Sequence, residues 1–335
     1  MRRDLVVIGA SAGGLEAIRT IVAAIPADFP AAICFVMHMA TGAPRVLDTL
    51  IGGVAKLPAV TVKDSERLTP SRIYLPCPDH HLVIEPGVIR ATRGPRENRF
   101  RPAIDPLFRS AAQVYGPRTI GIILTGWLGD GTAGLWAIKQ LGGLAIVQDP
   151  DEALAASMPA SALHHVNVDH RVRVAEIAPL LERLVRADLV EQGGYTVPEP
   201  LDIEVKIAAE QPALEAGVLK LGEPSPYACP ECHGVLLQMR EGDRTRYRCH
   251  TGHAYSADAL LASFDDAIED SLWTSVRSLQ EKALFLEHMA EHVRDSQPAD
   301  AQALLDQARD AYLRAESVRR TAIEQGERDG HKSAA

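Results

Sequence analysis

The sequence predicts an α/β fold: a doubly wound, mostly parallel sheet, followed by a small cysteine-rich knuckle and an α-helical hairpin. Short apolar runs rich in β-branched residues, such as 5–8 and 119–124, are typical of buried parallel strands. Segments with apolar residues at helical spacing alternate with these runs, which is the order of βαβ units. A C-x2-C pair late in the chain, followed by long helical periodicity, predicts the two smaller parts.

The elements of the α/β part follow in chain order. The predicted strands cover residues 5–8, 31–37, 59–62, two strands within 71–85 around a proline turn, 119–124 and 144–148. The predicted helices cover residues 15–25, 46–53, 104–114, 135–141, a stretch around 158–163, and 172–189. The arginine-rich segment 90–102 is expected to be a loop. The first strand, helix and strand predict a right-handed crossover between parallel neighbours.

Composition and length limit the class of protein. At 335 residues, with 46% hydrophobic and 24% charged residues, the chain can hold one large α/β domain and a smaller second unit. Apolar runs stay well below the roughly 20 residues of a membrane helix, and the N-terminus lacks the apolar segment of a signal peptide. We therefore expect a cytoplasmic protein without membrane insertion. The net charge of −9 argues against nucleic-acid binding.

Changes in composition along the chain predict five regions. The α/β domain is expected to span residues 1–192. Residues 193–226, which contain five prolines, are expected to form a linker. The knuckle is expected at 227–255 and the helical hairpin at 256–325. The polar residues 326–335 are expected to be a disordered tail.

A glycine-rich turn follows the first predicted strand. The segment Gly9-Ala-Ser-Ala-Gly has the G-x-S-x-G spacing of a nucleophile elbow, in which a serine lies on a sharp turn between a strand and a helix. Backbone N–H groups and the positive end of the helix then lie close to the serine oxygen. The other interpretation is a structural turn or a phosphate-binding loop with an incidental serine. A dinucleotide-binding loop is disfavoured because Ser11 replaces the second glycine of G-x-G-x-x-G.

A serine nucleophile needs a base, and the base needs an acid that orients it. His38 follows the second predicted strand, and Asp130 follows the strand at 119–124. Reactive groups of doubly wound sheets gather at the carboxyl ends of the strands, so we expect Ser11, His38 and Asp130 to lie close together. A structural histidine and an aspartate that caps a helix or turn remain the alternatives. The chain order Ser, His, Asp differs from the Ser, Asp, His order of α/β-hydrolases.

Several motifs together resemble one known family. In chain order they are Gly9-Ala-Ser-Ala-Gly-Gly, Val36-Met-His-Met, Asn98-Arg-Phe-Arg-Pro-Ala-Ile-Asp, Leu124-Thr-Gly-Trp-Leu-Gly-Asp-Gly and Gln148-Asp-Pro. In this order and spacing the sequence resembles the catalytic domain of the chemotaxis protein-glutamate methylesterases, CheB, over roughly residues 3–190.

The resemblance implies a serine esterase that hydrolyses glutamate γ-methyl esters on the cytoplasmic helices of methyl-accepting chemoreceptors. It also implies a glutaminase (deamidase) activity, other chemotaxis signalling proteins as partners, and no cofactor for catalysis. The family's triad falls on Ser11, His38 and Asp130.

The sequence departs from the family's pattern near the triad. The residue after the nucleophile, commonly threonine, is Ala12 here, and Trp127 stands in place of a methionine whose backbone N–H serves the oxyanion hole. We expect Ala12 and Trp127 to form the oxyanion and pocket wall, with an altered substrate preference. The family's familiar form also carries an N-terminal receiver domain that covers the active site. This sequence begins at the first esterase strand, so we expect no control by an aspartyl phosphate in cis.

The knuckle combines Tyr227-Ala-Cys-Pro-Glu-Cys-His-Gly with Cys249-His-Thr-Gly-His. Without an export signal, such clustered cysteines indicate a metal rather than disulfides. The favoured ligands of a tetrahedral, structural zinc are Cys229, Cys232, Cys249 and His253, with His250 or His233 as alternatives to His253. Strand-like segments at 235–238 and 246–249 fit a small zinc ribbon. The other interpretation is a reduced cysteine pair used for packing.

The C-terminal third lies beyond the family's catalytic domain and resembles an extension of some receiver-less methylesterase-like proteins. Either it packs on the esterase, or the zinc ribbon and hairpin replace the receiver as regulator or as tether to a receptor array. The arginines at 90, 93, 96, 99, 101 and 109 are a further candidate contact for acidic receptor helices, or a solvated face with internal ion pairs.

A function from another class remains open. The chain would then be a non-catalytic signalling adaptor that uses the esterase fold to bind a receptor or partner, while the zinc and helical tail transmits its state. Retention of all three triad residues favours the enzyme.

Overall fold

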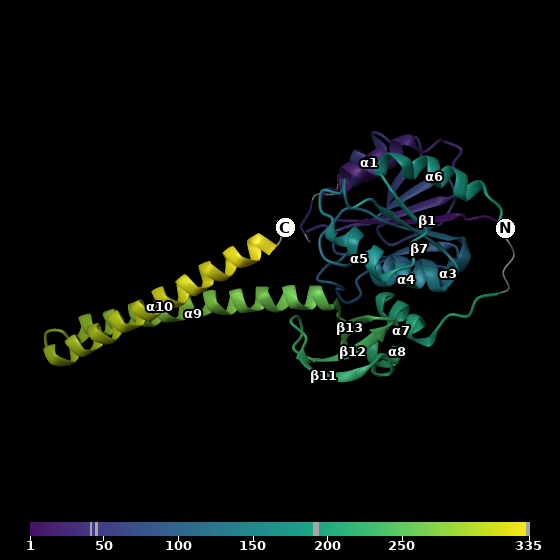
Figure 1. Cartoon of the computed structure of the whole chain (residues 1–335). Helices are drawn as coiled ribbons and strands as arrows, with labels where there is room; N and C mark the ends of the chain where they lie inside the picture. Colours follow the sequence, from purple (N-terminus) through teal and green to yellow (C-terminus); the bar gives the residue numbers. More distant parts are fainter. Residues whose placement is uncertain (41, 44–45, 190–193, 333–335) are drawn as a thin grey trace. The chain divides into compact units, whose positions relative to one another are not determined.

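The chain forms two compact units, Met1–Leu260 and Leu261–Ala335. The computed structural model describes residues 1–40, 42–43, 46–189 and 194–332. The first unit contains the α/β domain and the cysteine-rich knuckle together, and the second contains most of two long helices (Figure 1). The boundary predicted at residue 192 falls outside the described residues.

A seven-stranded sheet forms the centre of the first unit. Its strands are β1 (Leu5–Ala10), β2 (Ala32–Met37), β3 (Ala59–Thr61), β5 (Arg72–Leu75), β8 (Thr119–Ile123), β9 (Leu144–Gln148) and β10 (His170–Val172). They lie in the order β10-β9-β8-β1-β2-β5-β3, and every neighbouring pair is parallel. The predicted parallel sheet is confirmed. The chain proceeds from β1 toward β3 on one side and toward β10 on the other, so the topological switch point lies between β1 and β8.

Helices cover both faces of this sheet. One face carries α1 (Gly14–Ala24), α2 (Leu47–Gly52) and α6 (Val174–Arg186), and the other carries α3 (Ile104–Tyr115), α4 (Thr132–Gln140) and α5 (Ser157–His165) (Figure 1). Successive residues of β1 alternate between the two layers: Val6 and Ile8 pack with α1 and α6, and Leu5 and Val7 pack with α3 and α4. A strand that is buried on both sides needs the continuous apolar run seen in the sequence.

A three-stranded antiparallel sheet adjoins α3. It consists of β4 (Ser65–Arg67), β6 (His81–Glu85) and β7 (Val88–Thr92), in the order β4-β7-β6. The prediction of a loop from residue 90 is therefore wrong for residues 90–92. Gly87, with φ of 75°, closes the tight β6–β7 hairpin that pairs these residues. The short edge strand β10 was likewise absent from the prediction, which assigned residue 172 to a helix.

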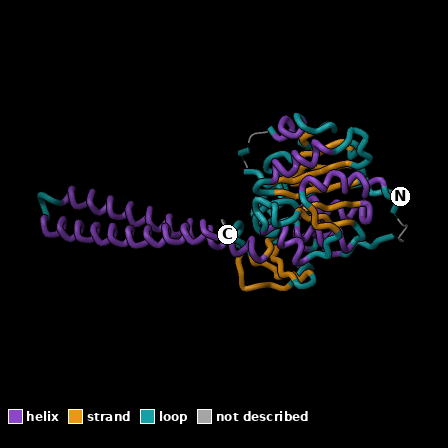
Figure 2. The backbone as a smooth tube through the Cα atoms, turned by 45° about the horizontal axis from the view of Figure 1, so that its top comes forward, coloured by secondary structure: helices purple, strands orange, loops and turns teal. Residues whose placement is uncertain are grey.

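The knuckle is a four-stranded antiparallel sheet next to two short helices. The elements are α7 (Glu199–Ala208), α8 (Ala213–Ala216), β11 (Glu223–Ala228), β12 (Val235–Glu241), β13 (Arg244–Cys249) and β14 (Ala254–Ser256) (Figure 2). The predicted linker at 193–226 is therefore wrong where α7, α8 and β11 lie. Leu201 and Val205 of α7 bury their side chains in the main core, and Ile203 and Ile207 bury theirs against the knuckle. Pro200 is tolerated in the first turn of α7.

Two long helices, α9 (Ala257–Val293) and α10 (Pro298–Lys332), lie side by side (Figures 1 and 2). Small residues at their contact, Ala283, Ala308 and Ala311, are buried together with Leu286. Helix α10 continues through Lys332, whereas the sequence predicted disorder from residue 326. Among the described residues, no helix combines the length and apolar character that crossing a membrane would need.

Candidate active site

Ser11 lies at the carboxyl end of β1, on the turn into α1. Its backbone N–H donates to the Thr125 carbonyl (2.9 Å), and the Gly14 N–H donates to the Ser11 carbonyl (2.9 Å). Gly13, the residue before α1, has φ of 75°, a left-handed conformation that favours glycine. A Cβ at Gly126 would lie 2.8 Å from the Ser11 Cβ. The glycines therefore permit both the sharp turn and the close approach of a second loop to the serine.

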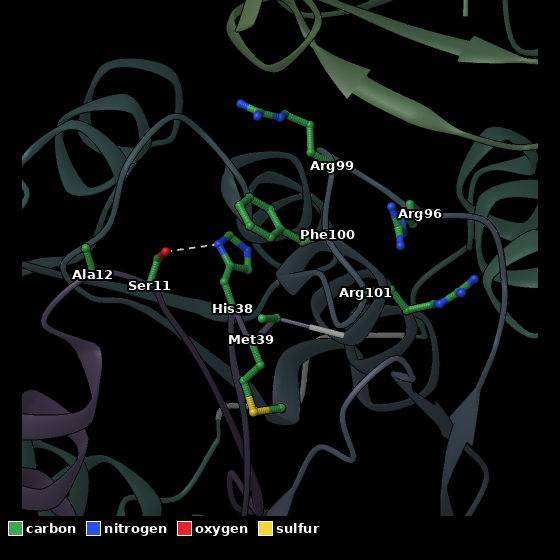
Figure 3. Close-up of a pocket in the computed structure, with 9 residues that line it drawn as sticks. Ser11, Ala12, His38, Met39, Arg96, Arg99, Phe100 and Arg101 are labelled. Atoms are coloured by element: carbon green, nitrogen blue, oxygen red, sulfur yellow. Dashed lines mark hydrogen bonds between the residues drawn. The ribbon is translucent and has the colours of Figure 1, made fainter. Parts of the chain in front are cut away.

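His38 bridges the other two predicted triad residues. Its Nδ1 lies 3.0 Å from the Ser11 Oγ (Figure 3). Its Nε2 lies 2.7 Å from the Asp130 Oδ2. An ionised carboxylate only accepts, so the imidazole hydrogen is assigned to Nε2. The Nδ1 lone pair then faces the Ser11 hydroxyl, as a general base requires. The structure thus brings Ser11, His38 and Asp130 together at the ends of β1, β2 and β8.

Asp130 is buried and saturated with hydrogen bonds. Its Oδ2 also accepts from the Ile104 N–H (2.7 Å), and its Oδ1 accepts from the Gly131 N–H (3.0 Å) and the Asn98 side-chain amide (2.8 Å). Burial alone would raise the pKa of Asp130, but the hydrogen bonds and charge of His38, together with those donors, hold the pKa below its ordinary value. The carboxylate therefore stays ionised opposite the imidazole.

A pocket of about 520 Å³ opens beside the serine. Its lining residues are Ser11, Ala12, His38, Met39, Ala40, Arg96, Arg99, Phe100 and Arg101 (Figure 3). The predicted pocket residue Ala12 lines it. Trp127, a residue that is 37% exposed, is not among these lining residues, and the role of its backbone N–H stays a prediction.

The six candidate arginines divide into three groups. Arg109 is buried and forms an ion pair with Glu97, so it is excluded from any surface contact. Arg90 and Arg93 pair with carboxylates outside the pocket. The other three line the pocket, and Arg101 is fixed there by Asp79, at 2.8 Å.

The four predicted metal ligands also come together. The ligand atoms of Cys229, Cys232, Cys249 and His253 all lie within 4.8 Å of one another. The sulfurs of Cys232 and Cys249 are 3.6 Å apart, and the His253 Nδ1 lies 3.5 Å from the Cys249 sulfur and 3.7 Å from the Cys229 sulfur. A tetrahedral zinc with ordinary bond lengths sets its ligand atoms about 3.5–3.8 Å apart, so the donor set fits this metal.

The remaining ring nitrogen of His253 supports the same ligand choice. Its Nε2 lies 3.4 Å from a carboxylate oxygen of Glu231, the kind of outer contact that orients a ligating histidine. His233 and His250 do not belong to this cluster.

Two residues that contact the triad escaped sequence reasoning. Asn98 donates to Asp130, and the ring of Phe100 stacks on His38. Both fall within the motif Asn98-Arg-Phe-Arg-Pro-Ala-Ile-Asp, which contributes only to the family resemblance. A conformational signal was available, since asparagine is among the residues that tolerate the left-handed backbone seen at Asn98 (φ 49°).

The fold and the site define a class of protein, a carboxyl-ester hydrolase built on a doubly wound parallel sheet. Comparison with known proteins then gives the family: the chain belongs to the CheB methylesterase family, whose profile matches residues 6–181.

Named relatives agree with this assignment. A Leptospira interrogans protein, assigned provisionally as protein-glutamate methylesterase/protein-glutamine glutaminase, is 36% identical over 193 residues, covering 57% of this chain and 100% of the relative. An Anaeromyxobacter dehalogenans protein-glutamate methylesterase/protein-glutamine glutaminase is 36% identical over 185 residues, but here the match covers 55% of this chain and 54% of the relative.

A solved structure is also similar. The crystal structure of the Thermotoga maritima CheB methylesterase catalytic domain superposes with a TM-score of 0.53 and 31% sequence identity, covering 55% of this chain and all of that domain.

Proposed function

We propose that this chain is a protein-glutamate methylesterase that hydrolyses glutamate γ-methyl esters on methyl-accepting chemoreceptors, and that it also deamidates receptor glutamines. The observation that carries the proposal is the hydrogen-bonded series Ser11–His38–Asp130 at the switch point of the sheet, with distances of 3.0 and 2.7 Å. The family membership supplies the substrate class.

The chemistry follows from the geometry. The His38 Nδ1 takes the Ser11 proton as the oxygen attacks the ester carbonyl, and Asp130 stabilises the imidazolium that forms. Backbone N–H groups of Ala12 and Trp127 would stabilise the oxyanion. His38 then gives its proton to the departing methanol, and water hydrolyses the acyl-enzyme by the same steps in reverse.

Methanol release from a methylated receptor tests the proposal. The wild type should release methanol and Ser11→Ala should not, and a serine-reactive probe should label Ser11 in the wild type but not in His38→Ala. If wild type and Ser11→Ala are equally silent while the receptor still binds, the chain acts as a signalling adaptor instead.

We also propose that the knuckle holds one structural zinc through Cys229, Cys232, Cys249 and His253. The interatomic distances support a fully protein-ligated tetrahedral site, which leaves no position for substrate. Metal analysis of the purified protein should give about one zinc per chain, and Cys249→Ser should lose it while Cys77→Ser keeps it. Zinc-free wild-type protein with intact folding would exclude this role.

A further inference from the structure

The loop of residues 96–100 lines the pocket beside Ser11 and pairs with the knuckle as if it were an added strand. Glu97 forms a parallel bridge with Ala254 of β14, the strand that directly follows the knuckle residue His253. The Asn98 N–H donates to the Ala254 carbonyl (2.7 Å), and the Ala254 N–H donates to the Arg96 carbonyl (3.3 Å). Residues more than 150 positions apart in the sequence thus share main-chain hydrogen bonds.

The side chain of Asn98 extends this connection into the triad. Its Oδ1 accepts from the Ser256 N–H (2.7 Å), while its Nδ2 donates to Asp130 (2.8 Å) and to Asp105 (3.0 Å). Asn98 is 4% exposed, and both ends of its amide are occupied. One side chain therefore bonds to the knuckle at one end and to the triad carboxylate at the other.

The backbone around Asn98 is held in an uncommon conformation. Asn98 and Arg99 have φ of 49° and 77°, left-handed values that are uncommon for residues other than glycine, although asparagine tolerates them better than most residues do. The resulting reversal of the chain directs Phe100 back onto His38, where the centroids of the stacked rings lie 3.7 Å apart. The same short loop therefore contacts two members of the triad.

Buried charges fix the base of this loop. Glu97 accepts from Arg248 of β13 (2.9 Å) and pairs with Arg109 of α3. All three side chains are buried. The loop is thus clamped between the knuckle and the helix whose first residues contact Asp130.

We propose that Asn98 is a positioning residue for Asp130, and that strand β14 of the knuckle fixes Asn98 in the orientation that catalysis requires. The proposal rests on the esterase function given above. The knuckle is then a part of the active site's support, rather than a separate domain on a linker.

Two substitutions distinguish the role of the Asn98 Oδ1 acceptor from that of its Nδ2 donor. Asn98→Gly removes the whole side chain and accepts the positive φ without strain. Asn98→Asp keeps the size and the Oδ1 acceptor but replaces the donor with a carboxylate oxygen facing two aspartates. The exposed Asn167, the chain's other asparagine, gives the matched controls Asn167→Gly and Asn167→Asp.

The pH dependence of turnover is the decisive measurement. Loss of one charge-assisted hydrogen bond to Asp130 should lower kcat of Asn98→Gly about tenfold to a hundredfold at pH 8. The kcat of Asn98→Asp should fall by at least the same factor at pH 8. It should rise toward the wild-type kcat by pH 6, because a protonated Asp side chain can donate again. KM should change little. A purely packing role predicts that the ratio of kcat between Asn98→Asp and Asn98→Gly does not change with pH, and that result would overturn the proposal.

Hydrogen exchange tests the link to the knuckle in the same proteins. The Ser256 amide should exchange faster in Asn98→Gly, which lacks the acceptor, and at the wild-type rate in Asn98→Asp, which keeps it. Equal protection in all three proteins would show that β14 does not hold Asn98.

The rate of Ser11 labelling by a serine-reactive probe, measured alongside, keeps this test independent of the substrate. If the wild type labels but releases no methanol, the methylesterase proposal fails while the role of Asn98 is still measured. If both Asn98 variants label and turn over like the Asn167 controls, the role of Asn98 fails and the methylesterase proposal stands.

Discussion

The ring of Phe100 lies parallel to the imidazole of His38, with centroids 3.7 Å apart and an angle of 8° between the planes. His38 has hydrogen bonds at both ring nitrogens, which fix its position in the plane of the ring. The stacked phenyl ring restrains the imidazole perpendicular to that plane. The π face of Phe100 also favours the imidazolium formed during acyl transfer.

Replacing Phe100 with leucine should therefore impair turnover more than stability. Leucine remains apolar but cannot stack, so we expect kcat to fall about threefold to tenfold, the range of a lost aromatic pair. Methanol release under saturating substrate measures this. Phe285→Leu on the exposed face of α9 is the matched control and should leave kcat unchanged. Equal kcat in Phe100→Leu and wild type would contradict the restraint.

Adding one methyl group at Gly126 should displace the nucleophile. The new Cβ would lie 2.8 Å from the Ser11 Cβ and from the Met158 side chain, closer than carbon atoms normally approach. A displacement of the serine by about 1 Å can reduce turnover about a hundredfold, because attack depends steeply on the position of the reacting oxygen. The rate of probe labelling at Ser11 measures the effect directly. Gly52→Ala, whose Cβ meets nothing within 4 Å, should label normally.

The sequence was sufficient to predict that Ser11, His38 and Asp130 lie close together, because the relevant information is local. Ser11 and His38 directly follow apolar strands, Asp130 lies in the loop after β8, and parallel strands bring their carboxyl ends to one edge of the sheet. The clustering of Cys229, Cys232, Cys249 and His253 was predictable for the same reason, since close pairs of cysteine and histidine need little knowledge of the fold.

The support of the triad was not predictable because it depends on distant pairing. Asn98 is held by Ser256, and no periodicity in either segment indicates the other. The prediction of a linker at 193–226 is wrong around α7 because it depended on the prolines of this segment. The contrary signals in the sequence were Pro200, which suits the first turn of a helix, and the apolar Leu201 and Val205 at helical spacing.

Removing the charge of Glu204 should destabilise the first unit strongly. Its carboxylate lies 2.8 Å from Arg246 and 2.7 Å from Arg248, and all three side chains are buried. Burial alone would raise the pKa of Glu204, but Arg109, Arg246 and Arg248 hold it well below its ordinary value. Glu204→Gln leaves buried arginines without this counter-charge.

We expect the free energy of unfolding to fall by about 3–5 kcal/mol in Glu204→Gln, the range for breaking a buried ion pair. Urea unfolding followed by tryptophan fluorescence gives the value. Glu199→Gln in the same helix removes an exposed pair with Lys220 and should change stability far less, because water screens this pair. Similar small losses in both variants would mean that the buried charges contribute little.

Stability should also fall as the pH rises toward neutrality, because of Asp105. Its Oδ1 accepts from the Gly134 N–H (2.6 Å) and its Oδ2 from Asn98 (3.0 Å), deep beside Asp130. Burial, and then the charge of Asp130, raise the pKa of Asp105 from 3.8 to about 7. Between these two values the folded protein keeps a proton that the unfolded chain releases, so folding becomes less favourable as pH increases through this window.

Asp105→Asn removes this titration. Between pH 5 and pH 8 the wild type should lose on the order of 3 kcal/mol of stability that the variant does not lose. Asparagine also gives up one acceptor, a loss that does not vary with pH, so the informative quantity is the difference in slope between the two curves. Urea midpoints measured at half-unit steps of pH provide it. Parallel curves for wild type and Asp105→Asn would show that Asp105 is already ionised at pH 5.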